Sequence, residues 1–125
     1  MKVFTIDDSK TMRNIVKSVL ATLGHTDIGE AGDGADALSR IDSFGPDLIL
    51  VDWNMPVMDG ITFVKQYRAK GGKAPIIMVT TEAEKTRVVE AIKAGVNNYV
   101  VKPFTPESLS QRINETMSRA PAKAA

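Results

Sequence analysis

The sequence contains no cysteine and a single histidine. The absence of cysteine excludes disulfide bonds, thiolate catalysis and zinc sites built on sulfur ligands. The formal net charge is +1, from 16 basic and 15 acidic residues, so the chain lacks the strong basic bias of nucleic-acid-binding domains. No apolar run approaches the roughly 20 residues that a membrane-spanning helix requires, and the first apolar run is shorter than that of a signal peptide. We therefore expect a soluble, cytoplasmic protein that binds neither nucleic acid nor membrane.

Two patterns of apolar residues alternate along the 125-residue chain. Short runs rich in β-branched residues, typical of strands buried on both faces, occupy residues 3–6, 48–51, 76–79 and 99–101. Between these runs apolar residues recur at helical spacing, with start and stop signals such as Gly, Pro and capping residues. Segment 26–31 has the position of a further strand but little β propensity, so we expect it at the edge of the sheet.

Five strand–helix units in succession predict an α/β fold. The chain is long enough for one domain and too short for two. We expect a single domain built as (βα)5, with a doubly wound, parallel, five-stranded sheet, helices on both faces and right-handed crossovers. We place this domain at residues 1–119. Residues 120–125 include no core-forming side chain, and we expect them to form a disordered tail.

Polar side chains follow four of the predicted strands directly: Asp7 and Asp8, Asp52, Thr80 and Lys102. The carboxyl ends of parallel strands meet at one edge of the sheet, so these side chains should lie together. Three close carboxylates repel one another unless a cation offsets their charge, and oxygen ligands without His or Cys favour Mg²⁺. Thr80 and Lys102 can meet the oxygens of a phosphoryl group. The set predicts a phosphoryl-transfer site with Asp52 as nucleophile and Asp7 and Asp8 as metal ligands.

Each of these residues also has a purely structural interpretation. Asp8 can cap the first helix, Thr80 can cap the helix that follows it, and Lys102 can be a solvated surface lysine. The functional interpretation depends on the joint occurrence of compatible groups at four strand ends. Asp33 and Asp59, which do not follow a strand in this way, we interpret as turn and cap residues.

Several motifs resemble those of bacterial response-regulator receiver domains, and within that family those of the single-domain chemotaxis regulators. The resemblance covers residues 2–118 and is carried by residues 6–9, 11–13, 52–60, 79–83 and 94–104. It implies the flavodoxin-like strand order 2-1-3-4-5, which is the order known for this family. It also implies a phosphoprotein of a two-component signalling system.

The resemblance implies a role for each candidate residue of the acidic site. Asp52 would be the phosphoacceptor, with Mg²⁺ as the cofactor. Asp7, Asp8, Asp52 and the main-chain carbonyl of Asn54 would surround the metal.

The resemblance further implies the groups that sense the phosphoryl group. Thr80 and Lys102 would contact it, and Thr80 and Tyr99 would form the conformational switch. The peptide bond between Lys102 and Pro103 would be cis. Thr81 stands where relatives often carry alanine, and the direction of its effect stays open.

As a member of this family the chain would be a switch protein rather than an enzyme, assisting its own phosphorylation and dephosphorylation. Its partners would be a sensor histidine kinase of the chemotaxis type and a flagellar motor switch protein, and we expect a monomer. The chain after residue 118 is too short for a DNA-binding output domain. A phosphate sink, a phosphorelay intermediate and a cell-cycle adaptor remain alternative outputs.

Two other classes share part of this pattern. A flavodoxin-like electron carrier would need hydroxyls and glycines after the first strand to hold a phosphate, whereas Asp7 and Asp8 would repel one. An aspartate-nucleophile phosphatase of the haloacid dehalogenase type carries a second Asp two residues after its nucleophile. That position is Asn54 here, so both classes fit less well than a receiver domain.

Overall fold

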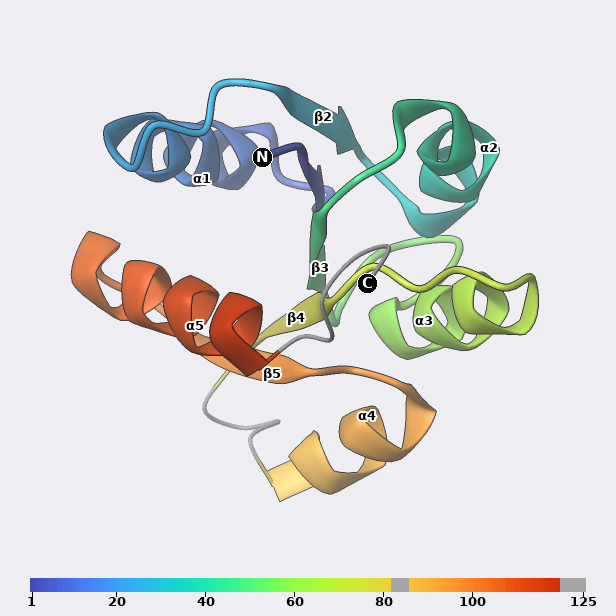
Figure 1. Ribbon diagram of the computed structural model, residues 1–125. Helices are drawn as coiled ribbons and strands as arrows, with labels where there is room; N and C mark the ends of the chain where they lie inside the picture. The colour runs from blue at the N-terminus through green and yellow to red at the C-terminus, as the bar shows by residue number, and fades with distance from the viewer. Residues whose placement is uncertain (82–85, 120–125) are drawn as a thin grey trace.

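The computed structural model describes residues 1–81 and 86–119 of the chain, so the tail predicted at 120–125 lies outside the described residues. Strands and helices alternate strictly (Figure 1). In chain order the elements are β1 (Val3–Ile6), α1 (Lys10–Thr22), β2 (Ile28–Ala31), α2 (Gly34–Phe44), β3 (Leu48–Asp52), α3 (Gly60–Ala69), β4 (Ile76–Thr81), α4 (Val88–Ala94), β5 (Asn98–Lys102) and α5 (Pro106–Arg119).

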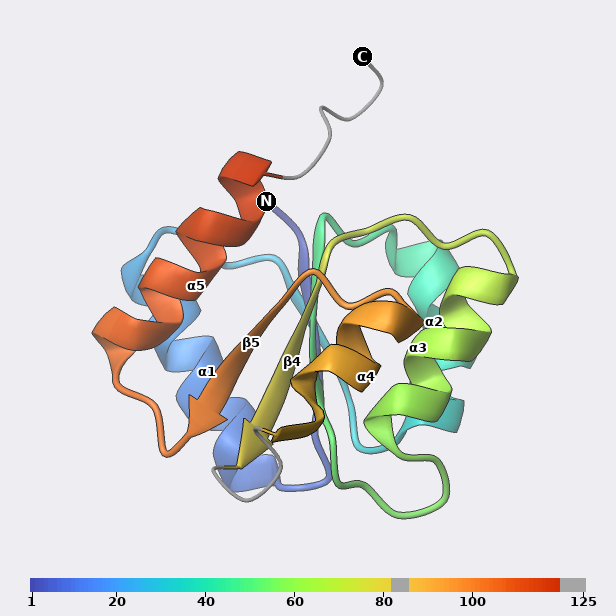
Figure 2. The same cartoon turned by 90° about the horizontal axis from the view of Figure 1, so that it is seen from below.

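The five strands form one sheet in the order β2-β1-β3-β4-β5, and every neighbouring pair is parallel. Helices α1 and α5 cover one face, and α2, α3 and α4 cover the other (Figures 1 and 2). The predicted single-domain, doubly wound (βα)5 fold and its strand order are therefore confirmed. The weak segment is confirmed as an edge strand, although β2 begins at Ile28, two residues later than expected. Within the described residues no helix is both long and apolar enough to cross a bilayer.

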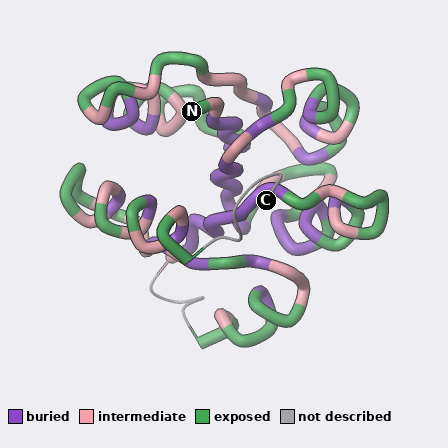
Figure 3. Tube along the Cα trace, in the orientation of Figure 1, coloured by how far each residue is buried: buried purple, intermediate pink, exposed green. Residues whose placement is uncertain are grey.

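Two apolar cores lie on the two faces of the sheet. Neighbouring residues of one strand point to opposite faces, so Val3 belongs to the core under α1 and α5, and Phe4 belongs to the core under α2 and α3. Figure 3 accordingly shows the inner strands β1, β3 and β4 as the buried centre, with the helices buried mainly on the side that faces the sheet. Burial on both faces explains why the strands have continuous apolar runs rather than alternating ones.

Strands β3, β4 and β5 run one or two residues further than their apolar runs indicated, whereas β1 ends at Ile6 as expected. Asp52 and Lys102 are the last residues of β3 and β5, and Thr80 is the penultimate residue of β4. The parallel ladder continues through them, with Thr80 opposite Val101 and Asp52 opposite Val79. The polar residues that were expected just beyond the strands are therefore held by the sheet itself. This placement gives their side chains a firmer backbone than a loop would provide.

Helix caps decide between the structural and functional interpretations of two candidate residues. Ser9, not Asp8, caps α1, and its side chain accepts a hydrogen bond from the backbone of the first turn. Asp33 and Asp59 cap α2 and α3, as predicted. Thr80 is a residue of β4 and does not cap α4, whose N-cap is Arg87. Asp8 and Thr80 are thus not explained by capping.

The loop between β3 and α3 returns very close to the end of β3. The amide of Gly60 donates a hydrogen bond to the carbonyl oxygen of Trp53 at 2.8 Å. A Cβ atom at Gly60 would lie 2.5 Å from the carbonyl oxygen of Asp52, closer than any carbon can approach. Only glycine allows α3 to begin here, so this position and the backbone of Asp52 are sterically coupled.

Candidate functional site

Four charged side chains from three strand ends converge at the carboxyl edge of the sheet. One carboxylate oxygen each of Asp7, Asp8 and Asp52 lies within 4.8 Å of the others. The Lys102 ammonium nitrogen lies 3.2 Å from Asp52 Oδ1 and 3.3 Å from Asp7 Oδ2. The structure therefore brings together four of the residues that the sequence placed at one edge. Because Lys102 is mostly buried and paired with two carboxylates, it is not a solvated surface lysine.

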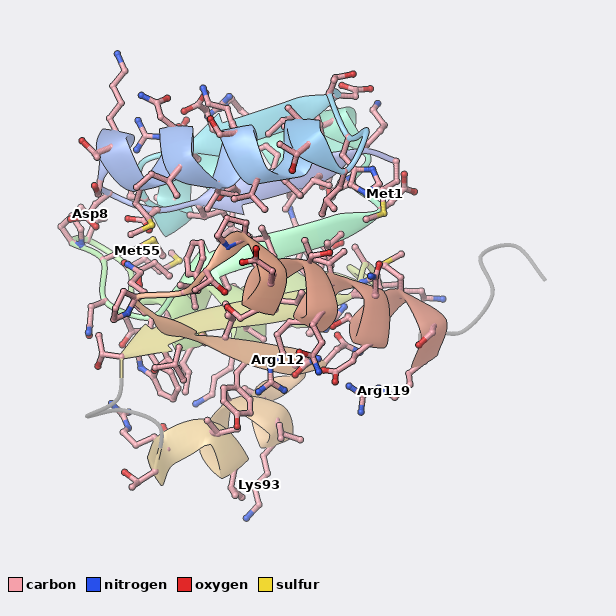
Figure 4. All side chains as sticks on the ribbon, turned by 90° about the vertical axis from the view of Figure 1, so that its left-hand side faces the viewer. Met1, Asp8, Met55, Lys93, Arg112 and Arg119 are labelled. Atoms are coloured by element: carbon pink, nitrogen blue, oxygen red, sulfur yellow. The ribbon has the colours of Figure 1, made fainter. Side chains whose placement is uncertain are left out.

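The site is deep on one side and open on the other. Asp7 and Asp52 are 3% and 6% exposed, whereas Asp8 is an exposed residue of the β1–α1 loop. Figure 4 shows Asp8 and Met55, from the loops after β1 and β3, at one end of the molecule and Met1 at the other. The carboxylate cluster is thus reached from solvent at the end of the sheet where these loops meet.

The electrostatic balance of the site is unfavourable for three ionised carboxylates. Burial and, to a lesser extent, the neighbouring Asp7 carboxylate raise the pKa of Asp52 to about 6, although Lys102 opposes both effects. Burial lowers the pKa of Lys102, but Asp52 and Asp7 outweigh that effect and raise it overall, so the ammonium stays charged. Among residues 1–81 and 86–119, one ammonium group, that of Lys102, is paired with this set of three carboxylates. A second cation with a preference for oxygen ligands, such as Mg²⁺, fits this donor set.

Thr80 and Tyr99 lie on β4 and β5, which follow β3 in the order of the sheet. The Thr80 side chain is fully buried, and its hydroxyl donates to the carbonyl oxygen of Thr81 at 3.4 Å, a long hydrogen bond. Tyr99 lies on β5, three residues before Lys102, and the Arg112 guanidinium lies 4.7 Å from the centroid of its ring. The two residues are linked through the pairing of β4 with β5 rather than through the acidic cluster.

Two further predictions concern the loops at the carboxyl edge of the sheet. Asn54 is exposed in the loop that follows β3. The peptide bond between Lys102 and Pro103 is cis, as the resemblance implied.

Two arginines near the site were not assigned a role from the sequence. Arg13 donates a hydrogen bond to the main-chain oxygen of Asp7 at 2.5 Å. The guanidinium of Arg87, just before α4, lies 4.7 Å from the centroid of the Trp53 ring, next to Asp52 in the chain. Arg13 lies within a motif that carried the resemblance, but no local pattern indicates which backbone atom it contacts. The contact of Arg87 with Trp53 joins residues 34 positions apart (87 − 53) and leaves no trace in the sequence.

Residues 3–114 match the family model described as the response regulator receiver domain. The chain belongs to this family. It is 47% identical over 116 residues to chemotaxis protein CheY1 of Helicobacter pylori, a match that covers 90% of this chain and 94% of that protein. It is 48% identical over 120 residues to a CheY homologue of Campylobacter jejuni, covering 94% and 92% of the two chains. The solved structure of Vibrio cholerae CheY4 superposes with a TM-score of 0.85 at 36% identity, covering 92% of this chain and 97% of that one.

Membership of the receiver family agrees with the geometry of the carboxyl edge. Receiver domains bind Mg²⁺ at an acidic pocket, and Asp7, Asp8 and Asp52 form such a pocket here. CheY-like response regulators are switch proteins rather than enzymes in the usual sense.

The charge on Asp52 predicts a pH-dependent change in stability in the absence of Mg²⁺. The pKa of Asp52 rises from 3.8 to about 6 on folding. The contribution of this group to the free energy of unfolding is therefore fully present below pH 3.8 and is lost as the pH rises through 6. We expect Asp52→Asn to raise the free energy of unfolding at pH 7 by about 1–3 kcal/mol and to change it little at pH 4.

Urea unfolding in EDTA at the two pH values measures this difference. The exposed Asp27, at the opposite edge of the sheet, provides the matched substitution Asp27→Asn, with which the effect of Asp52→Asn is compared. An Asp52→Asn variant that is no more stable than wild type at pH 7 would contradict the proposed charge imbalance.

Proposed function

We propose that the chain is a phosphorylation-activated response regulator that accepts a phosphoryl group on Asp52 from a histidine kinase. The observation that carries the proposal is the position of the Asp52 carboxylate. It ends a central strand, lies within ion-pair distance of Lys102 and shares a pocket with two further carboxylates. A nucleophile, a cation for the transferred group and ligands for a metal are the parts that phosphoryl transfer requires.

The chemistry follows from these groups. A carboxylate oxygen of Asp52 attacks phosphorus in line with the bond to the donor, an imidazole nitrogen in phosphohistidine. The P–N bond breaks, its electron pair leaves with the imidazole, and Asp52 becomes an acyl phosphate. Lys102 is placed to exchange its carboxylate partners for a phosphoryl oxygen.

Asp7, Asp8, Asp52 and the main-chain carbonyl of Asn54 would hold Mg²⁺. When bound, the metal ion offsets the charge of the carboxylates and of the phosphoryl oxygens. Asp7 and Lys102 already share an ion pair, so the site holds its charges close to where the phosphoryl group would be received. In this role the chain assists its own phosphorylation and the later hydrolysis of the acyl phosphate.

The switch would run from Thr80 to Tyr99. Phosphorylation adds about one further negative charge at Asp52, and the Thr80 hydroxyl would turn toward it from its long contact with the Thr81 carbonyl. That movement would empty space beside β5, into which the Tyr99 ring would turn. Two packings of this region, biased by one charge, suffice for a switch.

The output surface would consist of α4, β5 and α5. Val89 and Ile92 on α4 are 63% and 55% exposed, and Ile92 lines the same surface hollow as Tyr99. Lys85, expected on the same surface, lies outside the described residues. Because the named relatives are chemotaxis proteins, we propose a kinase of the chemotaxis type and a flagellar motor switch protein as partners of a cytoplasmic monomer. A phosphate sink, a relay intermediate and a cell-cycle adaptor are the alternative outputs.

Phosphorylation can be tested without the kinase. Incubation with acetyl phosphate and Mg²⁺ should add one phosphoryl group that is lost in hydroxylamine, because acyl phosphates are cleaved by this nucleophile. Mass spectrometry should place it on Asp52, and labelling should be absent from Asp52→Asn and normal in Asp27→Asn. Undiminished labelling of Asp52→Asn, or a hydroxylamine-stable product, would refute the assignment.

The motor target is tested by binding. The N-terminal peptide of the organism's own motor switch protein should bind more tightly when beryllofluoride occupies the site. A coupling free energy of about 1–3 kcal/mol corresponds to a gain of roughly 5- to 150-fold. Calorimetry with and without beryllofluoride measures it. Equal affinities would remove the motor as the target and leave the chemistry at Asp52 unaffected.

A further inference from the structure

The Arg13 side chain connects the β1–α1 loop with the edge strand β2. Its Nη1 atom donates a hydrogen bond to the main-chain oxygen of Asp7 at 2.5 Å, and its Nε atom donates to Glu30 Oε1 at 2.8 Å. The side chain is only 15% exposed. Because the guanidinium is planar and both contacts use it, the position of Glu30 determines the direction of the hydrogen bond to Asp7.

Glu30 is itself held firmly. It lies on β2 opposite Thr5 of β1, and its second carboxylate oxygen accepts a hydrogen bond from Lys17 Nζ at 2.6 Å. Hydrogen bonds from Lys17 and then from Arg13 hold the pKa of Glu30 below its ordinary value, so the carboxylate is charged at neutral pH. Two cations from successive turns of α1 therefore meet one carboxylate, but only Arg13 continues to the acidic site.

The acceptor of this hydrogen bond is the peptide group between Asp7 and Asp8. Other groups of Asp7 are also held by hydrogen bonds. Its amide donates to the carbonyl oxygen of Ala31, and its carboxylate accepts from the amide of Ser9. Asp8 is different, because it is exposed and its carboxylate makes no hydrogen bond or ion pair with any residue in 1–81 or 86–119. The direction of Asp8 thus depends on the plane of the peptide group that Arg13 holds.

We propose that Arg13, oriented by Glu30, is a positioning residue that aims Asp8 into the carboxylate cluster and thereby sets the affinity of the site for Mg²⁺. This inference rests on the metal site proposed above. It assigns a function at the metal site to the ion pair between Arg13 and Glu30, which also attaches the edge strand β2 to α1.

The direction in which a substitution of Arg13 changes the affinity for Mg²⁺ separates a positioning role from a simple electrostatic one. Removing a positive charge near an acidic pocket strengthens cation binding through Coulomb's law. Releasing the peptide group that orients Asp8 weakens cation binding, because the ligand must then be ordered when the metal binds. Residues that orient metal ligands through hydrogen bonds typically change metal affinity by about 10- to 100-fold when they are substituted.

The experiment measures Mg²⁺ dissociation constants by calorimetry, with unfolding in EDTA as a check on the fold. Arg13→Met should bind Mg²⁺ about 10-fold more weakly than wild type. Arg13→Lys keeps the charge but reaches only one of the two acceptors, so it should also bind more weakly. Glu30→Gln should give an intermediate loss.

Lys17→Met is the matched control, because Lys17 contacts the same carboxylate one turn further along α1 but not the Asp7 carbonyl. Its Mg²⁺ affinity should equal or slightly exceed that of wild type. Unchanged or tighter binding in folded Arg13→Met and Arg13→Lys would overturn the proposal, as would an equal loss in Lys17→Met. If the wild-type protein itself fails to bind Mg²⁺, the proposed metal site is wrong, and this inference is wrong with it. That outcome is measured on the wild-type sample, so it is distinguished from a failure of the Arg13 inference alone.

Discussion

Repulsion among Asp7, Asp8 and Asp52 is the constraint on which the other features of this structure depend. Their carboxylate oxygens lie within 4.8 Å of one another, two of the three residues are buried, and Lys102 is the ammonium that meets them. Water cannot screen buried charges well, so the arrangement opposes folding unless the rest of the chain holds it. The pairing of β1 with β3, and of β3 through β4 with β5, supplies that restraint, because the register of these strands fixes the positions of their carboxyl ends relative to one another.

The same constraint makes the site responsive. A group of charges that is out of balance changes its energy sharply when one charge is added or neutralised, whereas a balanced ion-pair network does not. The surroundings are arranged accordingly. Gly60 lets α3 begin against the backbone of Asp52. Thr80 is buried on the neighbouring strand and donates a long hydrogen bond to the Thr81 carbonyl, and Arg13 holds the loop that carries Asp8. Each of these groups joins the site to a different element of the fold.

The sequence predicted the parts of this arrangement that follow from strand periodicity. Buried parallel strands have continuous apolar runs, and the polar residue that ends each run must lie at the carboxyl edge, which located Asp52, Thr80 and Lys102. The exact strand ends were missed because the ladder continues through these polar residues. The ion pair of Arg13 with Glu30 and the contact of Arg87 with Trp53 were also missed. Such pairs join separate elements through side-chain conformation, for which local sequence carries no signal. The roles assigned to individual site residues remain predictions.

The central claim is that the Asp52 carboxylate is destabilised by its surroundings until a cation joins the site. Carbon-13 NMR of the aspartate carboxyl groups measures this directly, residue by residue, across a pH titration with and without Mg²⁺. Without Mg²⁺ the Asp52 resonance should titrate near pH 6, and saturating Mg²⁺ should move its midpoint well below that value. A midpoint near 3.8 in the metal-free protein, unchanged by Mg²⁺, would contradict the claim.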